Sequence, residues 1–323
     1  MKDINKTIDQ MKTRLPKELT NTLLPEELNE GDVLLFSPEK GSFISWAITF
    51  LTNAPVSHAA MLYKKSPLSI IEESPPQVAV NEALHRFHDR TIYVYRHASQ
   101  QELSPVITAA TLHRNNLEPY DNASLYIVGI LLLYKKISFP TLAQKVILRI
   151  LKKLTATLTQ YLQQHKNPGK MPMVCSQFVA QCFEDAGSQF QLHFHHQLLI
   201  AAHGQNLLDR AVEFIDQHPF SARNTVNITS NDTVTESDEE LCRALYAAID
   251  SGMVNNNVPA IDPELAQAIE EFAGINATLS GTQNNANTLT ATHQLQANMN
   301  MFVFPGDLLQ HCTSLKPVGK IEI

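Results

Sequence analysis

The sequence predicts an α+β fold, in which an antiparallel sheet or half-barrel packs on helices and further helical segments are inserted. Two observations predict it. Short apolar runs separated by turn residues fill the chain up to His97, as is typical of antiparallel strands. From Ser104 onward, apolar residues recur mainly with helical spacing. Strands are therefore expected in the first part of the chain and helices in the second.

The strands lie between residues 29 and 97, after a polar helical lead-in at 1–28. The first strand is GDVLLF, and a short helix with the only tryptophan, SFISWAITFL, follows it. Four more strand-like runs come next, in the order VSHAAMLY, LSIIEES, QVAVNEAL and TIYVYRH. A KKSP turn joins the first two of these, which predicts that they are neighbours in the sheet.

Helical patterns dominate the rest of the chain. Residues 142–162 are strongly amphipathic, with apolar side chains on one broad arc and basic side chains opposite. The apolar run at 126–134 is far shorter than the roughly 20 residues that span a bilayer, so it is predicted to be a buried helix or strand.

A helical hairpin is predicted further along. Ser237 and Glu240 have the spacing of a capping box, which begins one helix. An Asp-Pro pair at Asp262 begins the next, and we expect Gly274 to end it. Residues 275–300 are rich in Asn, Thr and Gln without a period, so we expect a mobile loop there.

These elements divide the chain into four parts. They are the lead-in at 1–28, a core at 29–220 with a helical insertion at about 138–168, an inserted hairpin and Asn/Thr-rich loop at 221–301, and a C-terminal return to the core at 302–323.

Composition favours a cytoplasmic protein with reduced thiols. The four cysteines lack the paired spacing of a disulfide framework or a zinc knuckle. The first residues carry charges throughout and lack the apolar stretch of a secretory signal. We expect a cytoplasmic location, or export by a route without a cleavable signal, which would also suit a bacterial effector delivered to another cell.

The net charge of −7 hides an uneven distribution. Residues 122–183 contain no Asp or Glu, whereas acidic residues gather in DTVTESDEE and IDPELAQAIEEF. This segregation predicts either an anionic partner or a packed helix with lysines in solvent. An anionic membrane surface would be contacted through Lys145, Arg149, Lys152 and Lys153. Little aromatic interleaving argues against a nucleic-acid partner.

One cysteine occupies a chemically special position. MVCSQFVAQCFEDAG has the apolar spacing of an amphipathic helix, and Cys175 falls in its first turn. Free N–H groups and the positive end of the helix dipole stabilise a thiolate there and can hold an oxyanion. The alternative is an inert buried cysteine at a helix start.

A thiolate nucleophile needs a base and a group that orients the base. His58, at the start of an apolar strand, is the best candidate for the base. Glu72 and Glu73 lie in the apolar stretch SIIEES, and either could orient the imidazole. Strand parity leaves both open, because a slip of one residue exchanges the faces of a strand.

In this order, GDVLLF, VSHAAML, IIEESPPQVAV, VCSQFVAQCFEDAG and FPGDLL resemble the circularly permuted papain-like cysteine hydrolases of the NlpC superfamily. The resemblance is to the YiiX-like group and its lecithin:retinol acyltransferase relatives, and it covers roughly half the chain. It implies a permuted papain-like catalytic core with Cys175 as nucleophile, His58 as base and Glu72 as the orienting acid. Tyr120 in PYD would line the site, and Glu73 and Ser176 are further candidates for its lining.

The expected activity is therefore cysteine-dependent hydrolysis of an amide or peptide-type bond through an acyl-enzyme. One alternative is a lipid-directed thiol acyltransferase or phospholipase at a membrane. Another is a non-catalytic binding protein on the same fold. No cofactor is implied. The histidines of HFHHQLLIAAH lack a recognisable zinc pattern, so no metal is expected.

Overall fold

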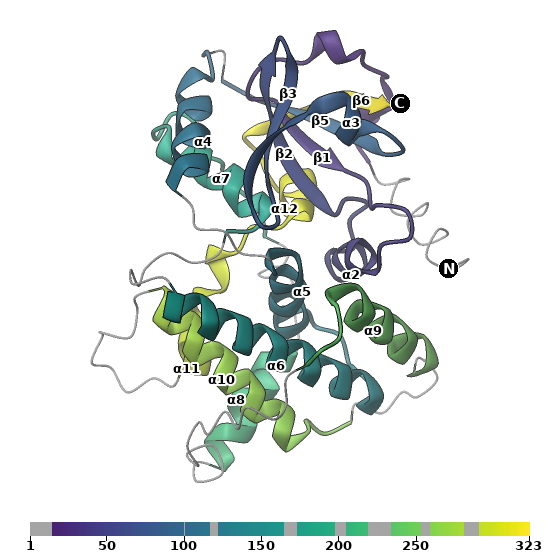
Figure 1. Ribbon diagram of the computed structural model, residues 1–323, viewed down its shortest axis with the longest axis vertical. Coiled ribbons are helices and arrows are strands. Elements are labelled where there is room, and N and C mark those ends of the chain that lie inside the picture. Colours follow the sequence, from purple (N-terminus) through teal and green to yellow (C-terminus); the bar gives the residue numbers. More distant parts are fainter. Residues whose placement is uncertain are drawn as a thin grey trace. The chain divides into compact units, whose positions relative to one another are not determined.

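The computed structural model (Figure 1) is α+β, as predicted. It describes residues 15–99, 101–116, 122–164, 173–197, 205–218, 234–252, 259–280 and 291–323. The chain forms two compact units. Unit 1 comprises Met1–Ala123, Met173–Leu198 and Phe302–Ile323, and unit 2 comprises Ser124–Pro172 and Leu199–Met301.

This division differs from the predicted segment boundaries. The helical insertion expected at about 138–168 is part of a larger unit, which also takes in the chain from 199 to 220 that we placed in the core. The return of the chain to the core at residue 302 coincides with the start of the last segment of unit 1.

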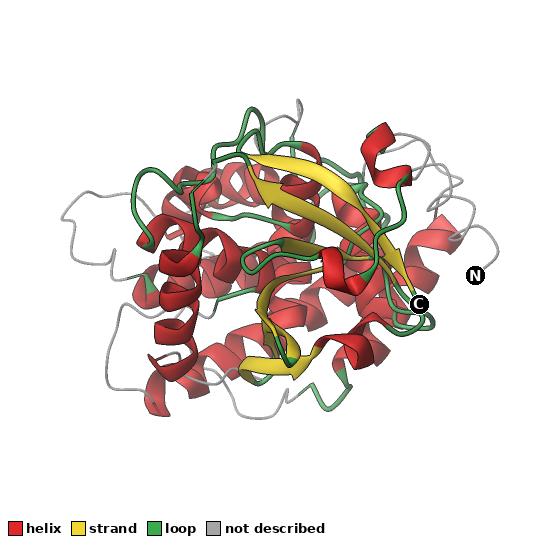
Figure 2. Cartoon of the chain, turned by 90° about the horizontal axis from the view of Figure 1, so that it is seen from above, coloured by secondary structure: helices red, strands yellow, loops and turns green. Residues whose placement is uncertain are grey.

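Unit 1 contains a six-stranded antiparallel sheet with the order β4-β3-β2-β1-β5-β6. Figure 2 shows the direction of the strands turning across the sheet, which is open and not closed into a barrel. The strands are β1 (Val33–Phe36), β2 (His58–Lys65), β3 (Leu68–Ser74), β4 (Gln77–Glu82), β5 (Thr91–His97) and β6 (Leu315–Glu322). The sequence analysis did not predict β6, an edge strand that contains Pro317 and Gly319.

Helices cover both faces of this sheet. They are α2 (Phe43–Thr52), α3 (Ala83–Phe87), α4 (Ser104–Asn116), α7 (Cys175–Asp185) and α12 (Pro305–Gln310). Of the predicted helical lead-in, the described part contains only two short 3₁₀ turns, Lys17–Thr20 and Pro25–Glu27. Residues 1–14 lie outside the described residues.

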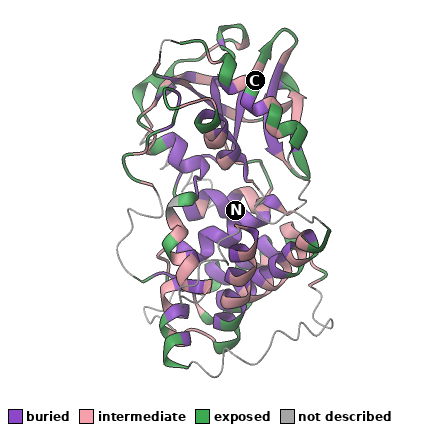
Figure 3. Cartoon of the chain, turned by 90° about the vertical axis from the view of Figure 1, so that its left-hand side faces the viewer, coloured by how far each residue is buried: buried purple, intermediate pink, exposed green. Residues whose placement is uncertain are grey.

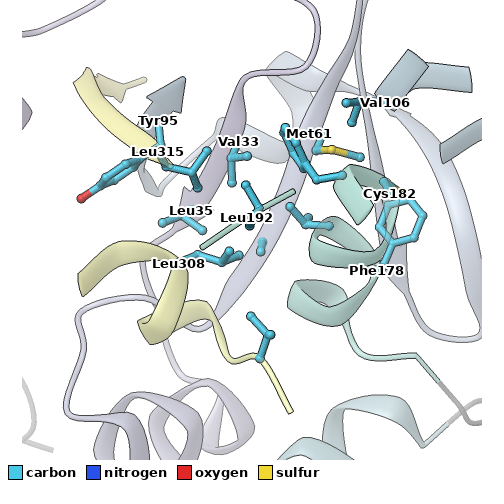
Figure 4. Close-up of a cluster of buried hydrophobic side chains, with 14 of the residues drawn as sticks. Val33, Leu35, Met61, Tyr95, Val106, Phe178, Cys182, Leu192, Leu308 and Leu315 are labelled. Atoms are coloured by element: carbon cyan, nitrogen blue, oxygen red, sulfur yellow. The ribbon is translucent and has the colours of Figure 1, made fainter. Parts of the chain in front are cut away.

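Successive side chains of a strand point to opposite faces of the sheet, so each strand contributes residues to two buried clusters. Val33 and Leu35 of β1 join a cluster that includes Phe178 and Cys182 of α7 (Figure 4). Leu34 and Phe36 face the other way and join a second cluster, to which α3 contributes Ala83 and Phe87. With both faces covered, β1 is buried along its whole length (Figure 3).

An ion pair between a buried carboxylate and a partly exposed guanidinium fixes the start of β1. The Asp32 carboxylate is fully buried and binds the Arg96 guanidinium on β5 through two hydrogen bonds of 2.7 and 2.8 Å. One of its oxygens also accepts a bond from the Asn29 backbone N–H. The GD of GDVLLF therefore has a structural role.

Unit 2 is helical in its described part. Its helices are α5 (Ala123–Tyr134, whose first residue belongs to unit 1), α6 (Thr141–Gln164), α8 (Leu207–Gln217), α9 (Asp238–Gly252), α10 (Pro263–Leu279) and α11 (Ala291–Ala297), followed by the 3₁₀ turn Asn298–Met301. The apolar run at 126–134 is thus helical. The predicted capping box forms, since Ser237 and Glu240 exchange backbone-to-side-chain bonds. None of the described helices is long and apolar enough to cross a membrane.

The prediction for residues 275–300 was wrong. Helix α10 passes through Gly274 and ends only at Leu279, and α11 and the 3₁₀ turn occupy 291–301. A polar residue can be buried in these helices where its side chain forms hydrogen bonds. Buried Asn276, for example, donates to the Phe272 carbonyl and accepts from the Tyr126 hydroxyl. Residues 281–290 lie outside the described residues.

The basic residues of α6 meet the acidic segments inside unit 2. Arg149 binds Glu236 at 2.6 Å, Lys152 binds Glu264 at 2.6 Å, and Lys153 binds Asp238 at 2.9 Å. Three of the four positions that we assigned to an anionic membrane surface therefore have acidic partners within the chain, and Lys145 is exposed.

Candidate active site

Cys175 is the first residue of α7. Val174, before it, is extended (φ −100°, ψ 158°) and offers no side chain to cap the helix. The backbone N–H groups of the first turn are therefore not engaged by a side-chain cap and can face an oxyanion. Farther along, Phe178, Val179 and Cys182 pack into the core and fix the helix against the sheet (Figure 4).

His58 begins β2 and so lies at one end of the sheet. Its Nε2 is 2.6 Å from Oε2 of Glu72, and its ring contacts the Phe36 ring edge-on at 5.5 Å. The Cys175 side chain lies close enough to the ring to affect its charge. Burial would lower the pKa of His58, but the charge and hydrogen bond of Cys175, followed by those of Glu72, raise it to about 9.

Glu72 is fully buried and held from three directions. Besides His58, Asn81 donates to Oε1 at 2.7 Å and Nη2 of Arg86 donates to Oε2 at 3.1 Å. Nε of Arg86 is also 2.7 Å from Oε1, although its N–H is not aligned for a hydrogen bond. Burial alone would raise the pKa of Glu72. The hydrogen bond and charge of His58, and then Arg86, lower it to about 2.

Strand register separates the two glutamates. Leu62 pairs with Ile70 and Met61 with Ile71, so Glu72 shares the face of Ile70 and the even-numbered side chains of β2, including His58. Glu73 points to the opposite face. The structure therefore brings Glu72, and not Glu73, to the His58 ring.

Glu73 is a second buried carboxyl group, 7% exposed. Burial raises its pKa to about 8; the His58 charge opposes this shift and the Glu72 charge adds to it. In the part of the chain that the structure describes, its side chain has no hydrogen-bonding partner. Most Glu73 side chains are therefore protonated at neutral pH, beside a carboxylate that stays ionised.

The other two candidates for the site lining have different outcomes. Ser176 is buried, and its hydroxyl donates to the Val303 carbonyl at 2.7 Å, which ties the start of α7 to the segment before α12. Tyr120 lies outside the described residues.

Sequence reasoning missed Asn81, Arg86 and Arg90. Asn81 was detectable in principle, because it is a polar residue at an alternating position of QVAVNE. Arg86 was not, because it belongs to the short helix α3, which has too few residues to produce a periodic signal. Arg90 precedes β5 and approaches Ser57 only through the fold.

The remaining cysteines have environments that suppress reactivity. Burial raises the pKa of Cys182 and of Cys242 far above the usual thiol value. Cys312 is partly exposed, but its burial raises its pKa to about 11. Among the four thiols, only Cys175 contacts an imidazole that a carboxylate holds in place.

No protein-family model matches the chain, and no curated protein sequence matches it significantly. The geometry of Cys175, His58 and Glu72 is therefore the basis for inferring a function.

Proposed function

We propose that this protein is a cysteine-dependent hydrolase that cleaves an amide or peptide-type bond through an acyl-enzyme. The observation that carries the proposal is the position of His58, which contacts the Cys175 side chain and is held by the buried carboxylate of Glu72 at 2.6 Å. Nucleophile, base and orienting acid in contact are the arrangement that activates a thiol.

The raised pKa of His58, about 9, keeps its imidazole protonated at neutral pH, and an imidazolium beside a thiol is an arrangement that activates the sulfur. In the proposed reaction, the Cys175 sulfur attacks the substrate carbonyl carbon. The first-turn N–H groups of α7 stabilise the resulting oxyanion. The C–N bond then breaks, and the amine leaves with the proton of His58. His58 next removes a proton from water, whose hydroxide displaces the thiolate and releases the acid.

The order of the site residues, with histidine before cysteine, is that of the permuted papain-like hydrolases that the sequence resembles. An open antiparallel sheet with Cys175 at a helix start beside it is compatible with such a core. Membership of that family is part of the proposal.

A lipid-directed reaction at a membrane has weaker support. The basic residues of α6 on which that alternative depended are in ion pairs with acidic residues of unit 2, apart from Lys145. A non-catalytic site is also disfavoured, because a binding protein has no need to hold a histidine between a buried carboxylate and a thiol.

Competitive alkylation tests the proposal. At neutral pH, limiting iodoacetamide should modify Cys175 before the other three cysteines, and His58→Ala should abolish this preference. Cys312 is the internal control, because it is more exposed than Cys175 but its pKa is raised. Peptide mapping by mass spectrometry reports the order. Faster modification of Cys312, or equal modification of all four, would contradict the proposal.

Turnover is the second part of the test. Cys175→Ala should remove all hydrolysis of a panel of acyl amides, esters and peptides, whereas Cys182→Ala, a change in the same helix, should retain it. Hydrolysis by the Cys175→Ala variant would rule out a thiol mechanism.

A further inference from the structure

Arg90 is a positively charged residue next to the candidate site that the proposed mechanism does not use. It precedes β5, and its Nε donates to the Ser37 carbonyl at 2.8 Å. Its Nη2 also donates to that carbonyl and to the Ser57 hydroxyl at 3.3 Å. Since Ser57 directly precedes His58, these bonds place the guanidinium beside the candidate base.

The Phe36 ring connects the two cationic groups. The Arg90 guanidinium lies 5.0 Å from the centroid of this ring, and the His58 ring lies 5.5 Å from it. The charges of Glu72 and Cys175 also act on Arg90. The guanidinium and the His58 ring therefore contact the same aromatic side chain.

The charge of Arg90 has no direct acidic partner. Among the described residues, it forms no ion pair, and its hydrogen bonds go to the neutral oxygens of Ser37 and Ser57. Glu39, an exposed residue, acts on it only through space. Burial, and then the charge of Arg86, lower the pKa of Arg90 to about 10, so it remains charged at neutral pH. Its Nη1 has no partner within the described protein.

The two arginines near the site differ in their partners. Arg86 is paired with the Glu72 carboxylate, whereas among the described residues no carboxylate is paired with Arg90. Nη1 of Arg90 is therefore the nitrogen left for a ligand. A half-buried, uncompensated guanidinium is costly unless an anion binds to it.

We infer that Arg90 is a specificity-determining residue that binds a carboxylate of the substrate close to the scissile acyl group. This inference rests on the proposed thiol chemistry and names the substrate class: acyl compounds with one carboxylate near the bond that is cleaved. A carboxylate carries the single negative charge that can balance one guanidinium without an ion pair. A dianionic phosphate would bring excess negative charge to the Cys175 thiolate.

Two alkylating agents of nearly the same size test the inference without a known substrate. Iodoacetate carries a carboxylate beside the carbon that Cys175 attacks, and iodoacetamide is its neutral counterpart. In the wild type, rate constants for Cys175 should favour iodoacetate. Arg90→Gln should lower the iodoacetate rate constant roughly tenfold, as expected for loss of one charge-assisted hydrogen bond, and change the iodoacetamide rate constant by less than about twofold.

Matched variants separate local from general charge effects. Arg114→Gln removes the same charge from an exposed position of α4 and should leave the ratio of the two rate constants unchanged. Arg90→Lys keeps the charge and should restore part of the preference. If Arg90→Gln does not fold, competition in the wild type still decides: propionate should slow alkylation by iodoacetamide at concentrations at which propionamide does not.

The possible failures are distinguishable. If iodoacetamide does not prefer Cys175 in the wild type, the proposed thiol function is wrong. Suppose instead that iodoacetamide does prefer Cys175. The carboxylate site is then refuted if Arg90→Gln leaves the ratio of the two rate constants unchanged, or if propionate and propionamide protect Cys175 equally.

Discussion

Glu72 and Glu73 are neighbours in sequence, yet their pKa values move in opposite directions, to about 2 and about 8. Both are buried, which raises the pKa of a carboxyl group. Glu72 overcomes this effect because His58, Arg86 and Asn81 bind it. Glu73 faces the other side of β3 without such partners, so burial determines its pKa. One residue of strand alternation thus separates an ionised group from a neutral one.

Glu73 should make folding stability depend on pH. The folded protein retains its proton up to about pH 8, whereas the unfolded chain releases it near 4.5. Its contribution is therefore present below pH 4.5 and is lost as the pH rises toward 8. Glu73→Gln should flatten this decline, by at most about 1.4 kcal/mol per pH unit. Urea unfolding of wild type and variant at several pH values measures the difference.

Glu82→Gln, a change at an exposed position at the end of β4, should leave the pH profile of the wild type intact. Glu72→Gln should behave in the opposite way to Glu73→Gln. The contribution of Glu72 is present above pH 4.5 and is lost as the pH falls toward 2, so this variant should be less stable at neutral pH. Parallel pH profiles for wild type and Glu73→Gln would mean that Glu73 is hydrated and ionised.

At the scale of elements, the sequence predicted those whose pattern is set locally. β3 and β5 have the predicted bounds, and α6 and α7 lie where apolar spacing placed them. The elements that were missed depend on the rest of the fold. β6 forms because β5 offers it an edge to pair with. The short α3 forms where two of its own residues, Ala83 and Phe87, become buried. The helix at 291–297 is polar in composition and buries only Thr292 and Leu295.

The ion pair of buried Asp32 with partly exposed Arg96 should stabilise unit 1. Asp32→Asn leaves the Arg96 guanidinium without its counter-charge and should lower the free energy of unfolding by about 3 kcal/mol. Chemical denaturation measures this loss. Asp89→Asn breaks the ion pair between Asp89, whose side chain is 66% exposed, and Lys40, whose side chain is 81% exposed. Because this pair is on the surface, the change should affect the free energy of unfolding little. Equal effects of the two changes would contradict a special role for the ion pair of Asp32.

The ion pairs of α6 can be tested by exchanging charges. Arg149→Glu should destabilise unit 2 by roughly 1 kcal/mol, since it places a carboxylate against Glu236 in a partly exposed site. Adding Glu236→Arg should restore most of the loss, and a double-mutant cycle at two salt concentrations measures the coupling. If Arg149→Glu has no effect on stability but abolishes sedimentation with phosphatidylserine vesicles, the basic face of α6 binds membranes after all.

At the scale of the whole molecule, the sequence was enough to predict the candidate triad but not the residues that contact it. Cys175, His58 and Glu72 carry local signals: a helix start, a polar residue in an apolar strand and an acid in the next strand. The choice between Glu72 and Glu73 needed the register, and Asn81, Arg86 and Arg90 needed the tertiary contacts. The division into two units could not be predicted either, because each unit is assembled from segments that are far apart in the chain.

The two units should fold separately to a large extent. Deleting Leu315–Glu322 removes β6, uncovers the edge of β5 and takes Ile321 out of its buried cluster. Hydrogen exchange should then show loss of protection in β1 and β5, while α6 and α10, which pack on each other in unit 2, stay protected. Uniform loss of protection in both units would show that the chain folds as one cooperative body.

The last segment of unit 1 also determines when the candidate site can be completed during translation. The ribosome makes Cys175, His58 and Glu72 long before it makes residues 302–323. Until then, β6 is not there to pair with the edge of β5, and the Val303 carbonyl that anchors Ser176 next to Cys175 does not yet exist. All of unit 2 is made first. A nascent chain should therefore carry an incomplete site until residues 302–323 are made, and the Cys175 thiol should gain its full reactivity only as β6 leaves the exit tunnel.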